Sequence, residues 1–222
     1  MVKSTWRHSA FGICITLSLI ALSFLFQPTK SISISPLLAK PAPAWTSVGF
    51  PDSLVQTGDL IVRTGTSFFS NELRKFSRRD PTYSHCGWVV RDSSDRLWVY
   101  HAIGGTDNPD NSLRKDPIAR FCDAKDIRQF ALFRYSIPKQ DKWHATQIAD
   151  SLYQARTPFD LSFDLQDDSE LYCAEFIWKI LKETANRAEF ISLSRLQDKD
   201  YVGIDDLYLH DHCTKIYEYA YH

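Results

Sequence analysis

The chain has 222 residues, of which 44% are hydrophobic, a length that fits one globular domain with a sizeable core and an appendage but excludes two full domains. Its 26 Lys and Arg residues nearly balance its 27 Asp and Glu residues, so a net charge of −1 argues against nucleic acid as a partner. Six Trp, ten Tyr and fourteen Phe residues suit a β-rich core or a site that holds apolar substrate.

The N-terminal segment has the pattern of a membrane-directed leader. Basic residues precede an apolar run over residues 10–26, so we expect residues 1–26 to be a signal peptide or an N-terminal membrane anchor. Ser31-Ile32-Ser33 is a poor cleavage site, which favours an anchor. The basic residues before the run predict a body on the extracytoplasmic side, either membrane-anchored or exported. Residues 27–50, rich in Ser and Pro, are expected to form a tether.

The body is predicted to occupy residues 51–222 and to begin with a strand and a helix. Thr57-Gly58-Asp59 forms a turn into a short buried strand at residues 60–63. Residues 67–79 then have helical spacing, and the apolar side of this helix would carry Phe68, Phe69, Leu73 and Phe76.

Two β-rich runs, residues 83–91 and 96–102, flank a polar turn and are predicted to form a hairpin. Direct pairing of His85 with His101 would place both histidines on one face, which requires a connection of odd length. The separation of aliphatic from aromatic side chains favours this register, with Gly87, Val89, Val99 and Leu97 beside the histidines and Trp88, Trp98 and Tyr100 on the other face.

The next segment alternates polar and structured stretches. Residues 106–126 are expected to be a polar loop that rims a cleft, and residues 129–135 form another strand. A helix capped by Asp141 should run to about Arg156. Near the C-terminus, residues 215–219 are expected to add a closing strand.

A cysteine lies at the start of the following helix. Ser169 is the expected cap of a helix that runs to about Asn186, so Cys173 falls in its first turn. Unpaired N–H groups and the helix dipole at that end favour an anion and therefore a lowered thiol pKa. The buried stripe of this helix would comprise Leu171, Ala174, Ile177, Trp178 and Leu181.

A cysteine hydrolase needs a thiolate, an imidazole and a group that orients the imidazole. Cys173, His85 and His101 fill these three roles, with His85 as the general base and then the acid. The backbone N–H of Cys173 and either Tyr83 or Tyr172 would bind the oxyanion and substrate. Each of these residues taken alone is more often an ordinary core residue.

Four motifs in this order resemble the permuted NlpC/P60 papain-like cysteine hydrolases of the YiiX/YebB type: Thr57-Gly58-Asp59-Leu60-Ile61, Tyr83-Ser84-His85-Cys86-Gly87, Tyr172-Cys173-Ala174-Glu175 and Ile204-Asp205-Asp206-Leu207. The resemblance implies an α+β fold in which an antiparallel sheet packs against a cysteine-bearing helix. It also implies that Cys173 is the nucleophile and His85 its histidine. The third member in that family is commonly a polar residue, often Glu, on the strand after the histidine strand, and the resemblance places His101 at that position here.

The expected activity is thiol-dependent hydrolysis of an amide bond through an acyl-enzyme, with no cofactor and no metal. The resemblance implies peptide-type substrates, such as those of the cell wall, or other amide-linked substrates, acyl-lipids included. A lipid-directed acyl hydrolase or acyltransferase is the alternative, supported by the aromatic content and the leader. A catalytically silent peptide- or lipid-binding domain on the same fold is a second alternative.

The remaining cysteines and histidines allow two further arrangements. An exported body permits a disulfide between Cys122 and Cys213, although the sequence does not establish the pairing. His210, His212 and Cys213 are close enough in sequence to suit zinc, but a strand would place His212 and Cys213 on opposite sides. The thiol site is therefore the preferred interpretation.

Overall fold

The computed structural model describes residues 52–105, 108–185 and 187–222. The expected leader (residues 1–26) and tether (residues 27–50) lie outside the described residues. Within the described ranges, no helix combines the length and the apolar character that a membrane crossing requires. The described residues all belong to one of the two compact units of the chain, Trp45–His222.

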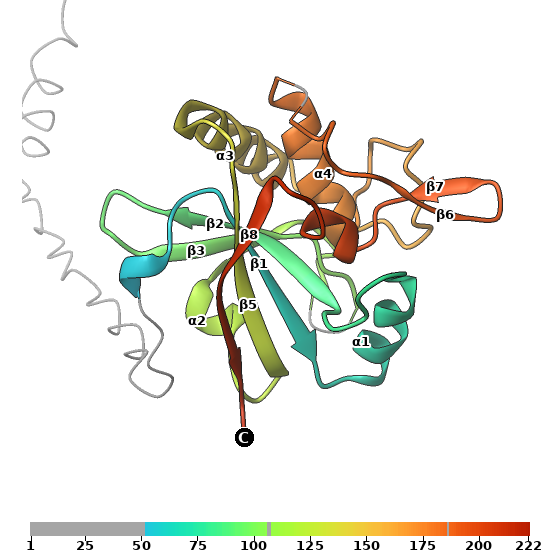
Figure 1. Cartoon of the computed structure of the whole chain (residues 1–222), viewed down its shortest axis with the longest axis horizontal. Helices are drawn as coiled ribbons and strands as arrows, with labels where there is room; N and C mark the ends of the chain where they lie inside the picture. Colours follow the sequence, from blue (N-terminus) through green and yellow to red (C-terminus); the bar gives the residue numbers. More distant parts are fainter. Residues whose placement is uncertain (1–51, 106–107, 186) are drawn as a thin grey trace, which may run out of the picture. The chain divides into compact units, whose positions relative to one another are not determined.

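A six-stranded antiparallel sheet forms the centre of the fold (Figure 1). Its strands follow the spatial order β4-β3-β2-β1-β5-β8, and every neighbouring pair is antiparallel. This arrangement, together with the helices, confirms the predicted α+β fold. The strands are β1 (Asp59–Gly65), β2 (His85–Arg91), β3 (Leu97–His101), β4 (Arg114–Pro117), β5 (Ile127–Tyr135) and β8 (Cys213–Ala220).

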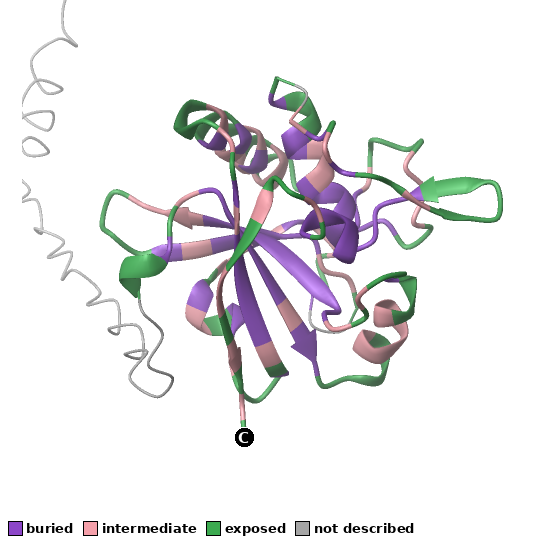
Figure 2. Cartoon of the chain, in the orientation of Figure 1, coloured by how far each residue is buried: buried purple, intermediate pink, exposed green. Residues whose placement is uncertain are grey.

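Alternating side chains divide the core into two layers, one on each side of the sheet. Leu60, Val62 and Trp88 face helices α3 (Lys139–Gln154) and α4 (Cys173–Glu183), in the larger cluster of buried residues. Their sequence neighbours Ile61 and Val89 face the opposite side, where the short helix α2 (Ile118–Phe121) packs. Figure 2 shows that burial is concentrated in the central strands and in α4. The predicted packing of the cysteine-bearing helix on the sheet is confirmed.

Smaller elements surround this centre. The first is a 3-10 turn, η1 (Asp52–Leu54). A β-hairpin of β6 and β7, which follows α4 in the sequence, projects from the body (Figure 1). The other short elements, in chain order, are α1 (Phe68–Leu73), η2 (Arg74–Phe76), β6 (Ser194–Leu196), β7 (Lys199–Tyr201) and η3 (Asp205–Leu207).

The structure places the side chains of β2 and β3 on the predicted faces of the sheet, but it pairs different residues across the two strands. Val89 lies opposite Val99, so residues of the same parity share a face and both histidines lie on one side, as predicted. The predicted direct pairing of His85 with His101 is wrong by two residues. His101 extends beyond the paired segment toward Gly87, and a Cβ at Gly87 would lie 3.3 Å from the Cβ of His101. The missing side chain at Gly87 leaves room for His101 to approach His85 diagonally.

Three predicted elements differ from the structure. The helix expected at residues 67–79 ends at Leu73 and continues as a 3-10 turn, and its expected buried residues Phe68 and Phe69 are 80% and 51% exposed. The expected loop at residues 106–126 contains β4 and α2. Asp141 does not cap α3, because its carboxylate accepts a hydrogen bond from Arg187 at 2.6 Å.

The disulfide that the sequence left open, between Cys122 and Cys213, does not form in the structure. All four cysteines of the described ranges are free thiols. Cys122 belongs to the α2 side of the sheet, whereas Cys213 packs against the cluster on the α3 and α4 side. The sheet itself therefore separates the two sulfur atoms.

Candidate active site

Cys173 is the first residue of α4, so the cap position is Tyr172, three residues after the expected cap Ser169. Ser169 does not cap it, because its hydroxyl and its backbone N–H both donate to the carboxylate of Asp167. Tyr172 takes the cap position instead, and its N–H donates to the carboxylate of Glu175 at 3.2 Å. Burial, together with the nearby negative charge of Asp160, raises the pKa of Glu175 to about 8, although the hydrogen bond from Tyr172 partly opposes them. Cys173 thus lies where the free N–H groups of a helix end gather.

The surroundings of Cys173 stabilise its thiolate. A hydrogen bond from the Cys86 thiol lowers the pKa of Cys173, and backbone N–H groups of Cys86, Ala174 and Cys173 itself lower it further, while burial opposes them. Burial raises the pKa of Cys86 well above the usual value for a thiol, and the Cys173 sulfur adds to this. Of this pair, Cys173 is therefore the thiol that gives up its proton more readily, and Cys86 stays protonated.

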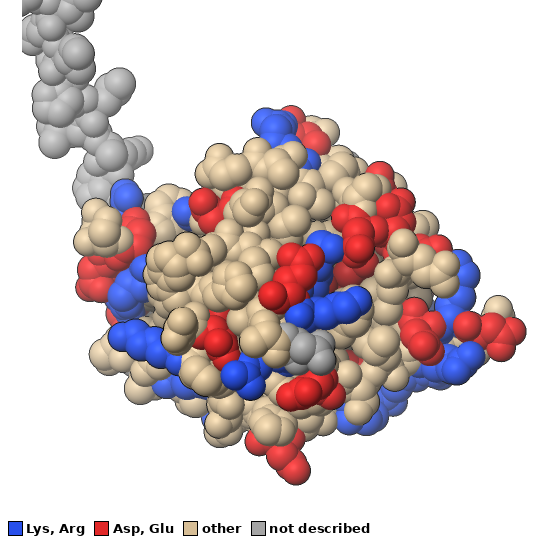
Figure 3. Space-filling view, turned by 90° about the horizontal axis from the view of Figure 1, so that it is seen from above, with Lys and Arg blue, Asp and Glu red and all other residues tan. Residues whose placement is uncertain are grey.

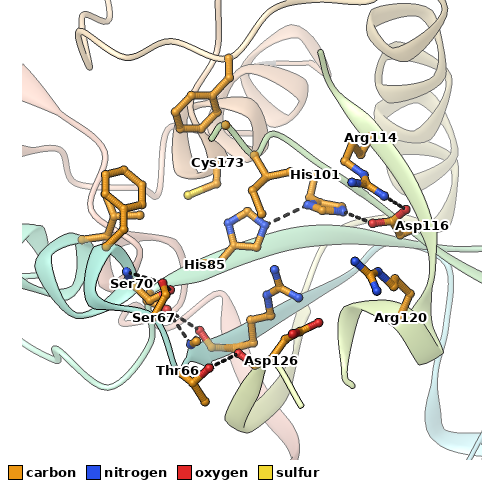
Figure 4. A pocket seen from close by; sticks show the side chains of 18 of the residues that line it. Thr66, Ser67, Ser70, His85, His101, Arg114, Asp116, Arg120, Asp126 and Cys173 are labelled. Carbon is orange, nitrogen blue, oxygen red and sulfur yellow. Dashed lines mark hydrogen bonds and ion pairs between the residues drawn. The ribbon is translucent and has the colours of Figure 1, made fainter. Parts of the chain in front are cut away.

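A hydrogen-bonded relay leads away from His85 across three neighbouring strands. Nε2 of His85 lies 2.9 Å from Nδ1 of His101, and Nε2 of His101 lies 3.2 Å from Oδ2 of Asp116. The other carboxylate oxygen of Asp116 accepts from Arg114 at 2.8 Å. Figure 4 shows these contacts as a continuous series of side chains that leads from His85, beside Cys173, to Arg114. The relay joins β2, β3 and β4 at one edge of the sheet.

The ionised carboxylate of Asp116 determines where the protons of the relay lie. Its pKa is lowered to about 2 by hydrogen bonds from His101 and Arg114, which together outweigh the effect of burial. A carboxylate only accepts, so Nε2 of His101 must carry a hydrogen and its Nδ1 must accept. Nε2 of His85 then donates to that Nδ1. The remaining nitrogen of His85, Nδ1, keeps its lone pair and is free to take a proton.

Burial keeps both imidazoles neutral. It lowers the pKa of His85 well below the usual value, and the positive charge of Arg63 adds to this effect. Burial also lowers the pKa of His101 to about 4, although the hydrogen bond to Asp116 partly opposes it. The ring of Phe121 stacks on His85 with centroids 5.5 Å apart and meets His101 edge-on at 5.2 Å. A general base has to be neutral before it accepts a proton, and this environment provides that state.

The predicted nucleophile, base and orienting residue line one cavity of about 160 Å³. Figure 4 shows Cys173 and His85 beside each other in this cavity, with His101 on the side of His85 that is away from Cys173. Its remaining wall is mixed: the polar and charged residues are Arg63, Thr66, Ser67, Ser70, Ser84, Arg114, Asp116, Arg120 and Asp126, and the apolar ones are Phe69, Leu73, Ile103, Phe159 and Phe163. The three side chains named from the sequence therefore lie at one place.

The two tyrosines expected at the oxyanion are placed differently. Tyr83 lies in the core, where its hydroxyl donates to Glu218 at 2.5 Å, and it lines neither of the two cavities that Cys173 borders. Its expected role is therefore not supported. Tyr172 lies next to Cys173, but its hydroxyl accepts the N–H of Val202 at 2.8 Å. The backbone N–H groups at the start of α4 remain as donors.

Asp116 and Cys86 are the site residues that sequence reasoning missed. Asp116 lies on β4, a strand of sequence Arg-Lys-Asp-Pro that has no apolar alternation to reveal it. Its place beside His101 depends on the pairing of β3 with β4, in which His101 lies opposite Arg114. Cys86 is part of the histidine motif, but nothing in the sequence indicates that its thiol contacts Cys173, because that contact exists only in the folded chain.

The alternative zinc site does not form. Among the described residues, no three His, Cys, Asp or Glu side chains are placed to hold a metal ion together. The imidazole of His210 contacts the backbone carbonyl of Leu207 at 3.1 Å, and His212 stacks on Phe190.

On the face of the molecule shown in Figure 3, acidic and basic side chains are interspersed, in keeping with the near-zero net charge.

Comparisons with known proteins agree with this geometry. Residues 54–202 match the family of permuted papain-like amidase enzymes, YaeF/YiiX, C92. The fold is similar to the crystal structure of metalloprotein yiiX from Escherichia coli O157:H7 (DUF1105), with a TM-score of 0.61 and 16% identity over 75% of this chain and 98% of that one. At this identity the likeness shows the fold alone. No curated protein matches the chain.

Proposed function

Because the chain belongs to the permuted papain-like amidase family, we propose that it hydrolyses an amide bond through a thioester on Cys173. The observation that carries this proposal is the relay of His85, His101 and Asp116, which ends at the cavity that Cys173 lines. Cys173 is the nucleophile, His85 the base and acid, and His101 and Asp116 position His85.

In the first half of the reaction, Sγ of Cys173 attacks the carbonyl carbon of the amide while Nδ1 of His85 takes the thiol proton. The carbonyl oxygen becomes an oxyanion, which the N–H groups at the start of α4 stabilise. The C–N bond then breaks, the nitrogen takes the proton from His85, and the amine leaves. The acyl group stays on sulfur as a thioester.

In the second half, His85 takes a proton from water, and the resulting hydroxide attacks the thioester carbon. The C–S bond breaks, the carboxylic acid leaves, and the sulfur recovers its proton from His85. Both halves use the same proton path, because Nε2 of His85 stays bonded to His101 throughout.

Peptide-type amides, including those of the cell wall, are the substrate class that we propose at this level. The apolar segment at residues 10–26 supports a location at or beyond a membrane, with the body on its extracytoplasmic side. Both points are expectations from the sequence that the geometry of the site leaves unchanged.

Alkylation with iodoacetamide tests the assignment without a known substrate. We expect Cys173 to react first near neutral pH and to react at least about tenfold more slowly in a His85→Ala variant, because the base that takes its proton is lost. Cys122 and Cys213 are internal controls, since burial raises the pKa of both thiols, that of Cys213 to about 12. Mass spectrometry of the peptides measures each site.

Two results would overturn the proposal. Equally slow labelling of all four thiols would favour a catalytically silent binding domain. Once a substrate is in hand, a Cys173→Ser variant that keeps near wild-type turnover would exclude the thioester.

A further inference from the structure

A cavity of about 590 Å³ lies at the start of α3, and we call it the α3 cavity. It has no lining residue in common with the two cavities that Cys173 borders. Its wall combines the first turns of α3 with the end of β2 that is opposite to His85 and with the segment that leads into β1. The volume falls within the range of about 300–1,000 Å³ that is usual for small-molecule sites.

The charged residues that line the α3 cavity are all basic. They are Arg91, Lys139 and Lys142, and no Asp or Glu of the described residues joins them in the wall. The guanidinium of Arg91 is already engaged, since it donates to the carboxylate of Asp95 and to the backbone carbonyl of Val55. Basic and acidic residues are almost equal in number along the chain, so composition alone does not predict a wall of one sign. The cavity therefore favours an anion.

Lys142 is the buried member of this set, with only 9% of its surface exposed. Its aliphatic stem lies against Gly58, where an added Cβ would lie 2.7 Å from the Cβ of Lys142. The carboxylate of Asp59 attracts the ammonium, but both oxygens of that carboxylate accept from Arg134 at 2.8 Å. Within the described part of the chain, the ammonium has no hydrogen bond and no ion pair of its own. A buried ammonium without a partner costs free energy, which an anion in the cavity would recover.

The start of α3 adds a second and independent attraction for an anion. No side chain caps this helix of 16 residues, whose cap position is Pro138. The carboxylate in its first turn, Asp141, is held by Arg187. Free N–H groups at such an end, together with the helix dipole, favour negative charge. Lys139 and Lys142 belong to this end of the helix, so both attractions act at one place.

We propose that the α3 cavity binds a phosphate group that is carried on an apolar body. A phosphate suits the site because it offers two negative charges to Lys139 and Lys142 and is a usual ligand of lysine and of helix N-termini. The apolar body would rest on the hydrophobic side chains of the same wall, which are Val55, Val90, Ile137 and Trp143. This site goes beyond the proposed amide hydrolysis and does not depend on it.

Two sources supply such a group, a soluble phosphomonoester and the headgroup of a membrane lipid. Two observations support the lipid. Trp143, which lines the cavity, is 58% exposed, and tryptophan is a residue that membrane interfaces favour. Val55 follows closely after the expected leader and tether, so the sequence places this wall next to the segment expected to approach a membrane.

Calorimetry on the full chain in a neutral detergent tests the site. The two ligands are phenyl phosphate and dibutanoylphosphatidic acid, a water-soluble lipid, and heats of titration into detergent alone are subtracted. We expect at least one of them to bind about tenfold or more tightly than both phenol, which lacks the charge, and inorganic phosphate, which lacks the apolar body. The tighter of the two ligands identifies the source. If neither exceeds phenol and inorganic phosphate, the proposal is wrong.

A matched pair of variants tests the cavity itself. Lys142→Met keeps an unbranched stem against Gly58 but removes the charge, and it should weaken binding of the tighter ligand at least about tenfold. Lys125→Met is the control, because Lys125 is an exposed lysine outside the wall and its loss changes the net charge equally. The control should leave the affinity unchanged. Equal losses in both variants would overturn the proposal, since net charge and not the cavity would then attract the phosphate.

Thermal unfolding gives a readout that needs no ligand. Because the ammonium is buried without a partner, Lys142→Met should raise the midpoint of unfolding by about 2–4 °C in buffer free of phosphate. The tighter ligand should then raise the midpoint of the wild-type protein and not that of the variant. A lower midpoint in the variant without ligand would overturn the site, because it would show that the ammonium already has a stabilising partner within the chain.

Discussion

The guanidinium of Arg114 affects the base although it lies far along the relay from it. It donates to Oδ1 of Asp116 and so leaves Oδ2 for His101. That choice of oxygen has no consequence in a symmetric carboxylate. The choice of oxygen becomes decisive in a variant in which one of the two atoms is a hydrogen-bond donor. Such a variant tests the proposed proton arrangement at the scale of single residues.

In an Asp116→Asn variant, Arg114 will hold the amide oxygen and turn the NH₂ group toward His101. Nε2 of His101 must then accept, its Nδ1 carries the hydrogen, and Nε2 of His85 becomes the acceptor. The proton of His85 moves to Nδ1, where it blocks proton transfer from Cys173. We expect kcat to fall by about two orders of magnitude or more with little change in KM, measured on any amide substrate.

The control for this tautomer argument is a change that removes the donor. Asp116→Ala should be less damaging than Asp116→Asn, because His101 is then free to adopt either tautomer. Adding Arg114→Met to Asp116→Asn should restore part of the activity by freeing the amide to turn. If Asn is tolerated better than Ala, the proposed proton arrangement is wrong.

Cys86 offers a second residue-scale test, through the acidity of Cys173. Replacing Cys86 with Ala removes the hydrogen bond that contributes most to the lowered pKa of Cys173. We expect the pKa of Cys173 to rise and its alkylation near neutral pH to slow several-fold. The pH dependence of the iodoacetamide rate measures this directly.

Cys86→Ser is the matched control, since a hydroxyl of similar size still donates a hydrogen bond. It should keep most of the lowered pKa, whereas a purely structural role of Cys86 would make Ala and Ser equally harmful through lost packing. Unchanged alkylation in the Ala variant would show that the backbone N–H groups alone stabilise the thiolate.

At the scale of elements, Gly87 allows β3 to present His101 to β2. An added Cβ would lie 2.3 Å from Cγ1 of Val99 and 3.0 Å from the carbonyl oxygen of Tyr100. Gly87→Ala should therefore destabilise the protein by about 1–3 kcal/mol and lower kcat by displacing His101 from His85. Urea unfolding and steady-state kinetics measure the two effects.

A compensating change identifies the cause. Val99→Ala removes the atom nearest to the new methyl group, so the double variant Gly87→Ala/Val99→Ala should recover activity relative to Gly87→Ala alone. If the loss is the same in both, the crowding lies at the backbone of Tyr100 and not at the Val99 side chain.

The strands that sequence patterns predicted are those rich in apolar or aromatic side chains. β1, β5, β8 and the β2–β3 hairpin were expected, and parity alone placed both histidines on one face. β4 is short, charged and at a sheet edge, so it has no such pattern. The start of α4 was predicted too early, because Ser169 forms a local turn with Asp167 that competes with capping.

The candidate site was likewise predictable only in part. Cys173, His85 and His101 carry chemistry that a motif reveals, and they meet in one cavity. Asp116 depends on long-range strand pairing, and the hydroxyl of Tyr83 bonds to Glu218, an exposed residue that lies 135 positions away in the sequence. Contacts of that range have no signal in local periodicity.

At the scale of the whole molecule, burial of the relay makes folding depend on pH. The pKa of His101 is about 4 in the folded protein and close to 6.5 in the unfolded chain, so between these values only the unfolded chain binds the proton. Stability is therefore lost as pH falls from about 6.5 to 4. Glu175 acts in the opposite direction, because its raised pKa favours the folded state at low pH.

A difference measurement isolates the histidine from such opposing groups. Relative to a His101→Asn variant, which has no group that titrates there, the wild-type protein should lose up to about 3 kcal/mol of unfolding free energy between pH 7 and pH 4. Urea titrations of both proteins at pH 7, 5.5 and 4 provide the comparison. Parallel curves would mean that His101 takes up its proton without cost to the fold.

The base, its orienting group and Asp116 all precede the nucleophile in the chain, and β8, which pairs with β5, comes after it. A ribosome releases these parts in that order. The growing chain therefore contains every residue of the proton relay before it contains Cys173. A chain interrupted between Asp116 and Cys173 therefore holds the residues of the relay without their nucleophile.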